Sequence, residues 1–472
     1  MTPDHGDLWF LPLGGCGEIG MNLNLYGHDG QWLMVDCGVT FRDVDGSSRS
    51  GFDVQMPDPT FIAERRESLG ALLLTHAHED HIGAVAHLWP RLRCPVHATP
   101  FTAEMLRRKL AERGLEGKVP VHLVEPGDRY AIGDFEVEWV ANTHSIPNPC
   151  ALMIRTPAGN VFHTADWKLD PGPVVGHDFD EARYRELGDA GVDTVVSDST
   201  CALRPGRSLS ESALHEGLLH HVRNAQGRVI VACFGSNIAR LQTLSRVAAE
   251  TGRHLGLLGR SLINTASAAR TVGLWGGPTL VESEHLGYLP RETLLLVATG
   301  SQGEPRTALG RLSRDGFRDL SLDAGDTVIF SARAIPGNER AIEQLIERLE
   351  ARGIVVVTPD RSSIPIHASG HPCEEELQTL FGWLRPRTLI PVHGENEHLI
   401  AQADIARDSG IERRLTGRNG DLFMLAPQPG VRRGAVSAGR LGVGRKSLER
   451  VALPTPTPAA ATDRSAGKIA GR

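Results

Sequence analysis

Residues 75–81 read Thr-His-Ala-His-Glu-Asp-His and directly follow the apolar run Ala-Leu-Leu-Leu at 71–74. His76 and His78 lie two residues apart at the end of a predicted strand, so their side chains can point the same way. Asp80 and His81 follow in the turn and can face a second ion. One histidine here would be read as part of a solvated turn. Four potential ligands after a buried strand instead predict a metal site.

Two ions need more than four ligands, so further His and Asp residues are expected at the ends of other strands. His144 follows the strand-like stretch 135–142, Asp166 ends the stretch 161–166, and His393 follows the apolar stretch 388–392. Each of these alone could equally be a loop histidine or a strand-end aspartate. Together they predict one site on which strand ends from distant parts of the chain converge.

The size and composition of the chain indicate a globular protein with two domains. It has 472 residues, of which 40% are hydrophobic and 23% charged, and no apolar run reaches the roughly 20 residues of a membrane span. The first ten residues do not resemble a signal peptide, so a cytoplasmic protein without membrane contact is expected. The seven cysteines are scattered and form no CxxC pair, whereas the 20 histidines favour imidazole over thiolate ligation.

The charge is unevenly distributed along the chain. The formal net charge is −7, which argues against a uniformly basic protein that coats nucleic acid. Residues 431–472 nevertheless hold nine Lys or Arg against two acids, a local charge of +7. This segment also contains Pro-Thr-Pro-Thr-Pro and Ala-rich sequence, and it is predicted to be a basic, disordered tail.

The periodicity of apolar residues divides the chain into three parts before this tail. Up to about residue 203 short strands dominate, at 22–26, 31–35, 71–75, 135–141 and 194–197. Strands at 229–234, 294–298 and 327–331 then alternate with helices at 237–250 and 338–352, which predicts an inserted α/β domain. The stretches 355–358 and 388–392 again read as buried strands, and no repeat of the solenoid or propeller kind is present.

Gly15, Gly17 and Gly20 match the spacing of a dinucleotide-binding fingerprint, and Asp36 lies near the place of its ribose-binding acid. That fingerprint requires a helix that opens at the glycines. Here the following residues, Met-Asn-Leu-Asn-Leu-Tyr-Gly, read as another strand. The nucleotide interpretation is therefore kept only as a minor alternative.

The ligand order, HxHxDH followed by His144, Asp166 and a late His393, resembles the metallo-β-lactamase superfamily, and more narrowly the ribonuclease J family. The segments that carry this resemblance cover most of the chain to about residue 425, and they are LGGCGEIGMN near the start, HAHEDH at 76–81, HSIP at 144–147, SDST at 197–200, GSQGE from 300, IPGNE from 335, HASGH from 367 and PVHGE from 391. The family implies an α/β fold in which a metallo-β-lactamase αββα sandwich (1–203 and 356–430) holds an inserted α/β β-CASP domain (204–355), with 431–472 left as the tail.

The resemblance also implies a role for each site residue. His76, His78 and His144 would bind one metal, Asp80, His81 and His393 the other, and Asp166 would bridge them. Two Zn²⁺ ions suit these ligands, with Mn²⁺ as the alternative. His371 would be the general acid, oriented by Asp198. Asp80, His371 and Asp198 form the catalytic set.

RNA is expected to be held by phosphate contacts and base stacking in loops, where Gly/Ser turns without any ligand are equally common. The candidate residues are Phe234, Ser236, Asn237, Ser301, Ser331, Arg333, His367, Ser369 and Gly370. Because the chain is acidic outside its tail, binding would need a local basic groove. The tail would add salt-sensitive attraction, or simply be solvated.

The family further implies a zinc-dependent ribonuclease that acts as a 5′-to-3′ exonuclease, and as an endonuclease, on single-stranded RNA with a 5′-monophosphate. Relatives usually continue into a C-terminal domain linked to oligomer assembly, which we expect to be absent or vestigial here, so that a homodimer would form through the core. The alternatives are a small-molecule hydrolase of the lactonase or thioesterase type, a DNA substrate, and a noncatalytic RNA-binding scaffold. The large insert argues against the first and the intact ligand set against the last.

Overall fold

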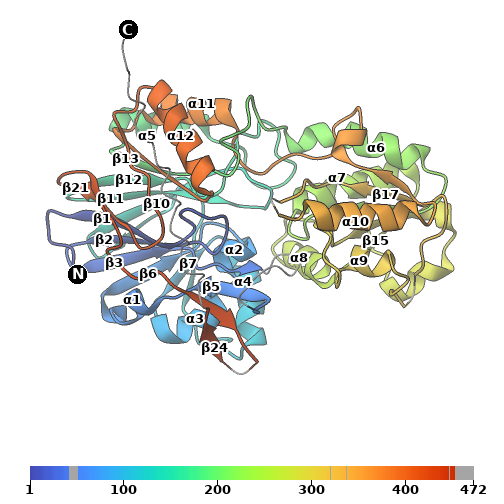
Figure 1. Cartoon of the computed structure of the whole chain (residues 1–472), viewed down its shortest axis with the longest axis horizontal. Helices are drawn as coiled ribbons and strands as arrows, with labels where there is room; N and C mark the ends of the chain where they lie inside the picture. The colour runs from blue at the N-terminus through green and yellow to red at the C-terminus, as the bar shows by residue number, and fades with distance from the viewer. Residues whose placement is uncertain (42–50, 319, 336, 446, 452–472) are drawn as a thin grey trace, which may run out of the picture.

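The computed structural model describes residues 1–41, 51–318, 320–335, 337–445 and 447–451. Two lobes lie side by side along the longest axis, as Figure 1 shows. One lobe is a sandwich built from the first and last parts of the chain, and the other is the inserted domain. No helix in the described part of the chain is long and apolar enough to cross a membrane.

The sandwich consists of two sheets that enclose a common core. The first has the order β22-β21-β1-β2-β3-β6-β7-β8 and the second β20-β19-β13-β12-β11-β10-β9. The strands of the first sheet are β1 (Leu8–Gly14), β2 (Leu23–His28), β3 (Gln31–Val35), β6 (Leu69–Leu73), β7 (Val96–Ala98), β8 (Val121–Leu123), β21 (Leu422–Ala426) and β22 (Gly430–Arg432). Those of the second are β9 (Arg129–Ile132), β10 (Phe135–Ala141), β11 (Cys150–Thr156), β12 (Gly159–His163), β13 (Thr194–Asp198), β19 (Thr388–Val392) and β20 (Arg413–Arg414).

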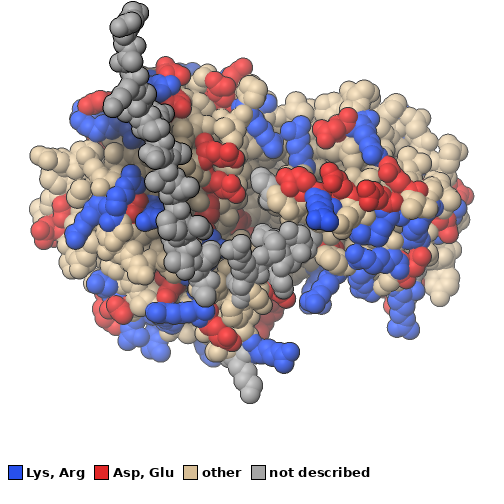
Figure 2. Space-filling model, in the orientation of Figure 1, with Lys and Arg blue, Asp and Glu red and all other residues tan. Residues whose placement is uncertain are grey.

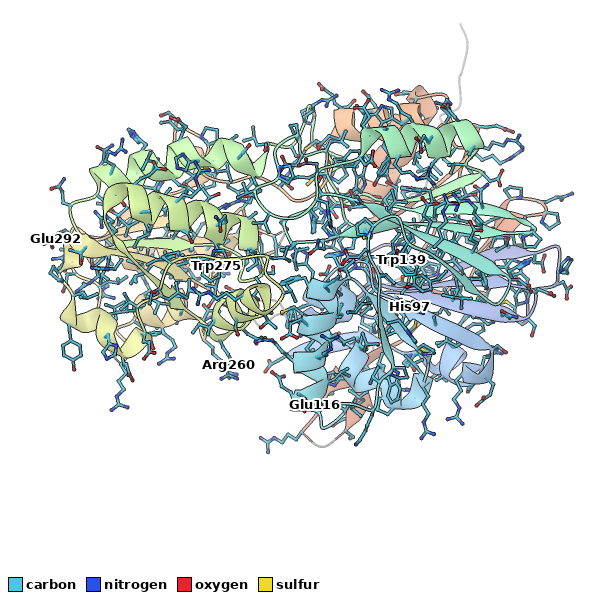
Figure 3. All side chains as sticks on the ribbon, turned by 180° about the vertical axis from the view of Figure 1, so that it is seen from behind. His97, Glu116, Trp139, Arg260, Trp275 and Glu292 are labelled. Carbon is cyan, nitrogen blue, oxygen red and sulfur yellow. The ribbon has the colours of Figure 1, made fainter. Side chains whose placement is uncertain are left out.

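Apolar side chains of both sheets meet in this core because alternate strand residues point to the same face. Phe10 and Leu33 of the first sheet pack in one cluster with Val137 and Ile390 of the second. His97 of β7 also stacks on Trp139 of β10 across the two sheets, with ring centroids 5.7 Å apart (Figure 3). The predicted strands at 31–35, 135–141 and 388–392 are thereby confirmed with their bounds.

Helices cover both outer faces of the sandwich, which gives the αββα order that was predicted. The first sheet packs against α1 (Thr60–Ala63), α3 (Val85–Leu92) and α4 (Pro100–Glu112), and the short α2 (Glu79–Ile82) begins within the sequence that was predicted to bind metal. The second sheet packs against α5 (Glu181–Ala190), α11 (Glu374–Leu384) and α12 (Asn396–Asp408).

The inserted domain has a five-stranded parallel sheet in the order β15-β16-β14-β17-β18. Its strands are β14 (Val229–Ala232), β15 (His254–Leu258), β16 (Leu294–Ala298), β17 (Thr327–Phe330) and β18 (Val355–Val357). One face packs against α6 (His215–Asn224), α7 (Ile238–Thr251) and α8 (Arg260–Thr271), and the other against α9 (Ala308–Leu312) and α10 (Glu339–Glu350). The lobes also meet directly, because Arg108 of α4 donates to Asn264 Oδ1 of α8 at 2.9 Å.

Two predicted boundaries need correction. The insert does not end at residue 355, because Val356 and Val357 of β18 pair with β17 inside the inserted sheet. Nor is the chain disordered from residue 431. Strand β23 (Arg440–Val443) pairs with β5 (Val54–Pro57) and β24 (Leu448–Arg450), in a small sheet that also contains β4 (Thr40–Phe41). Leu441 is buried there, so apolar burial outweighs the basic composition. The rest of the predicted tail, 452–472, lies outside the described residues.

Candidate metal centre

Four loops at one end of the sandwich strands bring the predicted ligands together. The loop between β6 and α2 provides His76 and His78, and α2 itself provides Asp80 and His81. The loops after β10, β12 and β19 provide one residue each, namely His144, Asp166 and His393. Seven residues spread over more than 300 positions of sequence thus converge on one buried cluster, as the sequence predicted.

The first group of potential ligands is His76, His78, His144 and Asp166, whose ligand atoms all lie within 4.8 Å of one another. The Nε2 atoms of His76 and His144 each lie 3.1 Å from Nδ1 of His78. Asp166 Oδ2 lies 3.9 Å from His76 Nε2 and 3.8 Å from His144 Nε2. Three nitrogens and a carboxylate oxygen therefore face a common point.

The second group is Asp80, His81, Asp166 and His393, within the same limit of 4.8 Å. Asp80 Oδ2 lies 3.1 Å from His393 Nε2 and 3.5 Å from His81 Nε2. Asp166 Oδ2 is 3.3 Å from His81 Nε2. Because Asp166 belongs to both groups, its carboxylate can bridge two ions.

Hydrogen bonds to the outer nitrogens orient the histidine rings. His81 Nδ1 donates to Asp36 Oδ2 at 2.7 Å, and His144 Nδ1 donates to the carbonyl of Gly370 at 2.5 Å. The Thr75 hydroxyl donates to Asp36, so His76 Nδ1, at 3.0 Å, donates to that hydroxyl. In a neutral ring, each bond places the proton on the outer nitrogen and leaves a lone pair on the inner one. This arrangement suits a bound cation.

The pKa values differ between the two groups. Burial lowers the pKa of His76 and His144 well below the usual value, and that of His78 to about 4. Burial also opposes the charged form of His81 and His393, but Asp166 and the neighbouring carboxylates raise their pKa well above it. The surroundings of the first group thus favour neutral imidazoles, whereas the carboxylates around the second group favour positive charge there.

The backbone at the site is strained in the way that functional sites often are. Asp36, Ala165 and His393 all adopt left-handed conformations, with φ of 62°, 50° and 51°. Residues other than glycine rarely adopt these angles, and the energetic cost persists only where the surroundings enforce it. All three residues follow the ends of strands at the His/Asp cluster, and His393 belongs to the cluster itself.

His371 lies next to this cluster and is paired with a carboxylate. Its Nδ1 is 2.7 Å from Asp198 Oδ2, its ring centroid is 5.0 Å from that of His144, and its side chain is 22% exposed. Burial lowers its pKa, but Asp198 outweighs burial and raises the pKa above the usual value. Asp198 itself is buried and also accepts a hydrogen bond from Thr200, which contacts His393 Nδ1 at 2.9 Å.

The predicted RNA-binding residues fall into two sets. Phe234 and Arg333 are exposed, and Ser236, His367, Ser369 and Gly370 are partly exposed. Asn237, Ser301 and Ser331 are buried. Asn237 accepts from the backbone of Arg240 at 2.8 Å, and Ser331 donates to the carbonyl of Ile366, so both interact within the protein and do not face a ligand.

Gly370 has a structural role that was not predicted. Its carbonyl holds His144, and a Cβ at this position would lie 2.7 Å from Cε1 of that histidine. Since real Cβ atoms essentially never come so close, only glycine allows this approach. Gly370 thereby orients His144, and its contact with RNA stays a prediction.

Asp36, Thr200 and Asn22 contact the cluster but were not predicted as part of it. Asn22 Nδ2 lies 3.1 Å from both the carbonyl of Asp80 and Nε2 of His81. Asp36 was noted only for the nucleotide alternative, which is wrong because β2, and not a helix, follows the glycines. The available signal for Asp36 was its position directly after the buried strand β3, because the predicted ligands also follow the ends of strands.

Comparison with known proteins agrees with this geometry. Residues 21–195 match the family model of the metallo-beta-lactamase superfamily, 226–349 that of the ribonuclease J beta-CASP domain, and 364–415 that of the Zn-dependent metallo-hydrolase RNA specificity domain. Fold and site therefore define a metallo-hydrolase of the metallo-β-lactamase superfamily that contains a β-CASP domain.

The chain belongs to the ribonuclease J family. It is 47% identical over 429 residues to ribonuclease J of Sinorhizobium meliloti, which covers 90% of this chain and 75% of the relative. The corresponding enzyme of Mycolicibacterium smegmatis is 39% identical over 445 residues, or 93% and 78% of the two chains. Family, domains and cluster together identify a metal-dependent ribonuclease.

A solved structure shares the fold at much lower sequence similarity. A protein of unknown function from Enterococcus faecalis V583 aligns over 89% of this chain and 100% of its own, with a TM-score of 0.58 and 16% identity. At this identity the likeness concerns the fold alone.

Proposed function

We propose that the chain hydrolyses RNA phosphodiester bonds with two zinc ions, from the 5′ end and also internally. The observation that carries this proposal is the cluster of inward-facing nitrogens and carboxylates beside the His371–Asp198 pair. All seven cysteines are free and buried, and none belongs to the cluster. The potential ligands in the cluster are therefore imidazole and carboxylate groups. They suit Zn²⁺, with Mn²⁺ as the alternative.

The proposed ligand assignment follows the two groups of the cluster. His76, His78 and His144 hold one ion, Asp80, His81 and His393 hold the other, and Asp166 bridges them. When bound, such a pair of ions supplies Lewis acidity toward a water nucleophile and the scissile phosphate. Asp36, Thr75 and Gly370 keep the rings in the required tautomers through their hydrogen bonds.

His371 is proposed as the general acid that protonates the leaving 3′ oxygen. Its Nδ1 is held by Asp198, so its Nε2 can carry the proton that is transferred. Asp198 raises the pKa of His371 above its usual value, which favours the protonated ring that a general acid needs. Partial exposure of the ring allows it to reach a substrate that enters from the solvent.

Single-stranded RNA with a 5′-monophosphate is the proposed substrate. Phe234, which is 39% exposed, offers a ring on which a base can stack, and Arg333 an exposed cation for a phosphate. Figure 2 shows Lys and Arg side chains gathered on part of the right-hand lobe, beside a row of acidic side chains. Such a local positive field suits the RNA backbone. A homodimer and a cytoplasmic location complete the proposal.

The test is product analysis on one RNA, labelled at its 5′ end and carrying either a monophosphate or a triphosphate there, with Zn²⁺ or Mn²⁺ supplied. Labelled mononucleotide released mainly from the monophosphate form supports the exonuclease. Discrete internal fragments from both forms support the endonuclease. Absence of cleavage with either metal would refute the proposed function and favour a small-molecule substrate.

A further inference from the structure

A series of buried polar contacts leaves the metal cluster, crosses the base of the inserted domain and returns to the cluster. It begins between the loops of His144 and Asp166. The backbone N–H of Lys168 donates to the carbonyl of Thr143 at 2.9 Å, and the Thr143 hydroxyl donates to the carbonyl of Lys168 at 2.6 Å. These two residues lie next to, or two positions from, proposed metal ligands.

The series continues into residues 209–211, the incoming segment that leads to the inserted domain. The ammonium of Lys168 is fully buried, 3.0 Å from Asp170 Oδ2, and it also donates to the carbonyl of Leu209 at 3.0 Å. Asp170 Oδ2 accepts from the backbone N–H of Glu211 at 3.0 Å. The loop that contains Asp166 is thus tied to the incoming segment.

Glu211 then forms a two-point ion pair with Arg240 of α7. The distances are 2.9 Å from Oε1 to Nη2 and 3.2 Å from Oε2 to Nε, and the side chains are 2% and 1% exposed. Arg240 Nη1 donates to the carbonyl of Ser331 at 2.7 Å, and the Ser331 hydroxyl donates to the carbonyl of Ile366 at 2.5 Å. A pair this deeply buried leaves an uncompensated charge if one partner is removed.

Ile366 begins residues 366–371, the returning segment that leads back to the sandwich. This segment contains Gly370, whose carbonyl orients His144, and His371, which is held by Asp198. Both connections between the lobes are therefore fastened to one buried ion pair. The positions of Gly370 and His371 next to the metal cluster depend on how the returning segment is held.

We propose that Glu211 and Arg240 are positioning residues for the hydrolysis of RNA. They hold the returning segment so that Gly370 and His371 stand at the correct distance from the metal cluster. In this way the placement of the inserted domain is coupled to the geometry of the reaction. The proposal rests on the proposed ribonuclease function for its kinetic consequences, but its structural part can be tested without any turnover.

A second buried ion pair in the same domain offers a matched control. Arg228 Nη1 lies 3.1 Å from Asp326 Oδ2, and these side chains are 9% and 0% exposed. Arg228 precedes β14 and Asp326 precedes β17. Both therefore lie at the opposite end of the strands from Ser331, which follows β17 and bonds to Arg240. The side chains of this pair also bond to Ser321, Asp323 and Arg291 of the inserted domain. Disruption of either pair should lower the stability of the inserted domain. Only disruption of the Glu211–Arg240 pair should affect the returning segment.

The experiment compares Glu211→Gln with Asp326→Asn by hydrogen exchange and by RNA kinetics. Glu211→Gln should speed exchange in peptides that cover residues 366–371 and 142–147. It should also lower kcat by about tenfold to a hundredfold with little change in KM, as the loss of groups that orient ligands does. Asp326→Asn should leave exchange in both peptides and kcat as in the wild type. Equal exchange in the two variants would overturn the proposal.

Ser331→Ala provides a milder variant that remains informative if Glu211→Gln does not fold. It removes only the hydroxyl between Arg240 and Ile366, so exchange at residues 366–371 should rise and kcat should fall by a smaller factor, about fivefold for one hydrogen bond. Unchanged exchange in this variant contradicts the positioning role. Lack of RNA cleavage by the wild type would instead refute the proposed function, and the exchange comparison would still decide the role of the pair.

Discussion

Polar side chains gather at the carboxyl ends of strands in both halves of the molecule. In the sandwich, the inner nitrogens of His76 and His144 each lie 3.1 Å from that of His78, and the outer nitrogens of His76 and His144 are held by protein groups. In the inserted domain, Asn237 and Ser331 bond to Arg240, which in turn pairs with Glu211. The first set converges on a point that a cation would occupy. In the second set, the polar groups form their hydrogen bonds with one another. The hydrogen-bond partners therefore distinguish a binding site from a structural network. The residue types alone do not make this distinction.

The largest effect is expected from removal of ligands in the first set. Asp80→Ala combined with His81→Ala should abolish RNA turnover and lower the bound metal by one ion per chain, because the second group loses two of its four members. RNA binding should persist, since the inserted domain is intact. Cleavage rate, metal content and RNA affinity are measured together.

His122→Ala is the control for this variant, because His122 is an exposed histidine on β8. It should retain wild-type turnover and metal content. If the double variant also kept full turnover, the His/Asp cluster of the sandwich would not be the catalytic site. The contrast between the two halves of the molecule would then have no functional meaning.

His371→Ala should reduce kcat by about 10² to 10⁴, the usual contribution of a general acid. Metal content and KM should change little, because the ring is placed beside the ligand groups and paired with Asp198. Asp198→Asn should act in the same direction by leaving the ring without its carboxylate. A parallel fall in metal content in His371→Ala would show that His371 is a ligand and not an acid.

Asp36→Asn should weaken metal binding by about tenfold to a hundredfold while the ligands themselves remain. The reason is that Asp36 accepts from both His81 and Thr75 and so fixes the two rings next to it. Competition with a chromogenic chelator measures the affinity. An unchanged affinity would mean that the rings are held by packing alone.

The smallest effects separate exposed from buried residues in one loop. Phe234→Ala should weaken RNA binding by about 1 to 3 kcal/mol through loss of base stacking, with no effect on thermal stability. Asn237→Ala should instead cost about 1 kcal/mol of stability through loss of the α7 cap, with RNA affinity unchanged. RNA anisotropy and thermal unfolding on both variants provide the comparison, and a reversed pattern would show that Asn237 faces the substrate.

The strands of the sandwich and the polar residues that cluster at their ends were predictable from the sequence because both depend on local signals, whereas the ligand roles stay a prediction. Apolar runs such as 31–35 and 388–392 end directly before Asp36 and His393, and this order of strand and polar residue was recognisable at most ligands. The support that Gly370 gives to His144 was not predictable, since it joins residues 226 positions apart. Asn237 and Ser331 were misplaced because a small polar residue after a strand has the same local pattern whether it is buried or exposed. The β23–β5 pairing was missed for a related reason, as strand pairing across the chain outweighs local composition.

The dependence of catalysis on the His/Asp cluster is tested most directly by the rate of RNA cleavage by metal-depleted protein as zinc is added back. We expect no cleavage in the presence of a chelator, and full recovery when about two ions per chain have been bound, as a shared two-ion cluster requires. Asp80→Ala with His81→Ala should not recover at any zinc concentration. Cleavage that survives complete removal of metal from the wild type would contradict the central claim that this cluster performs the reaction.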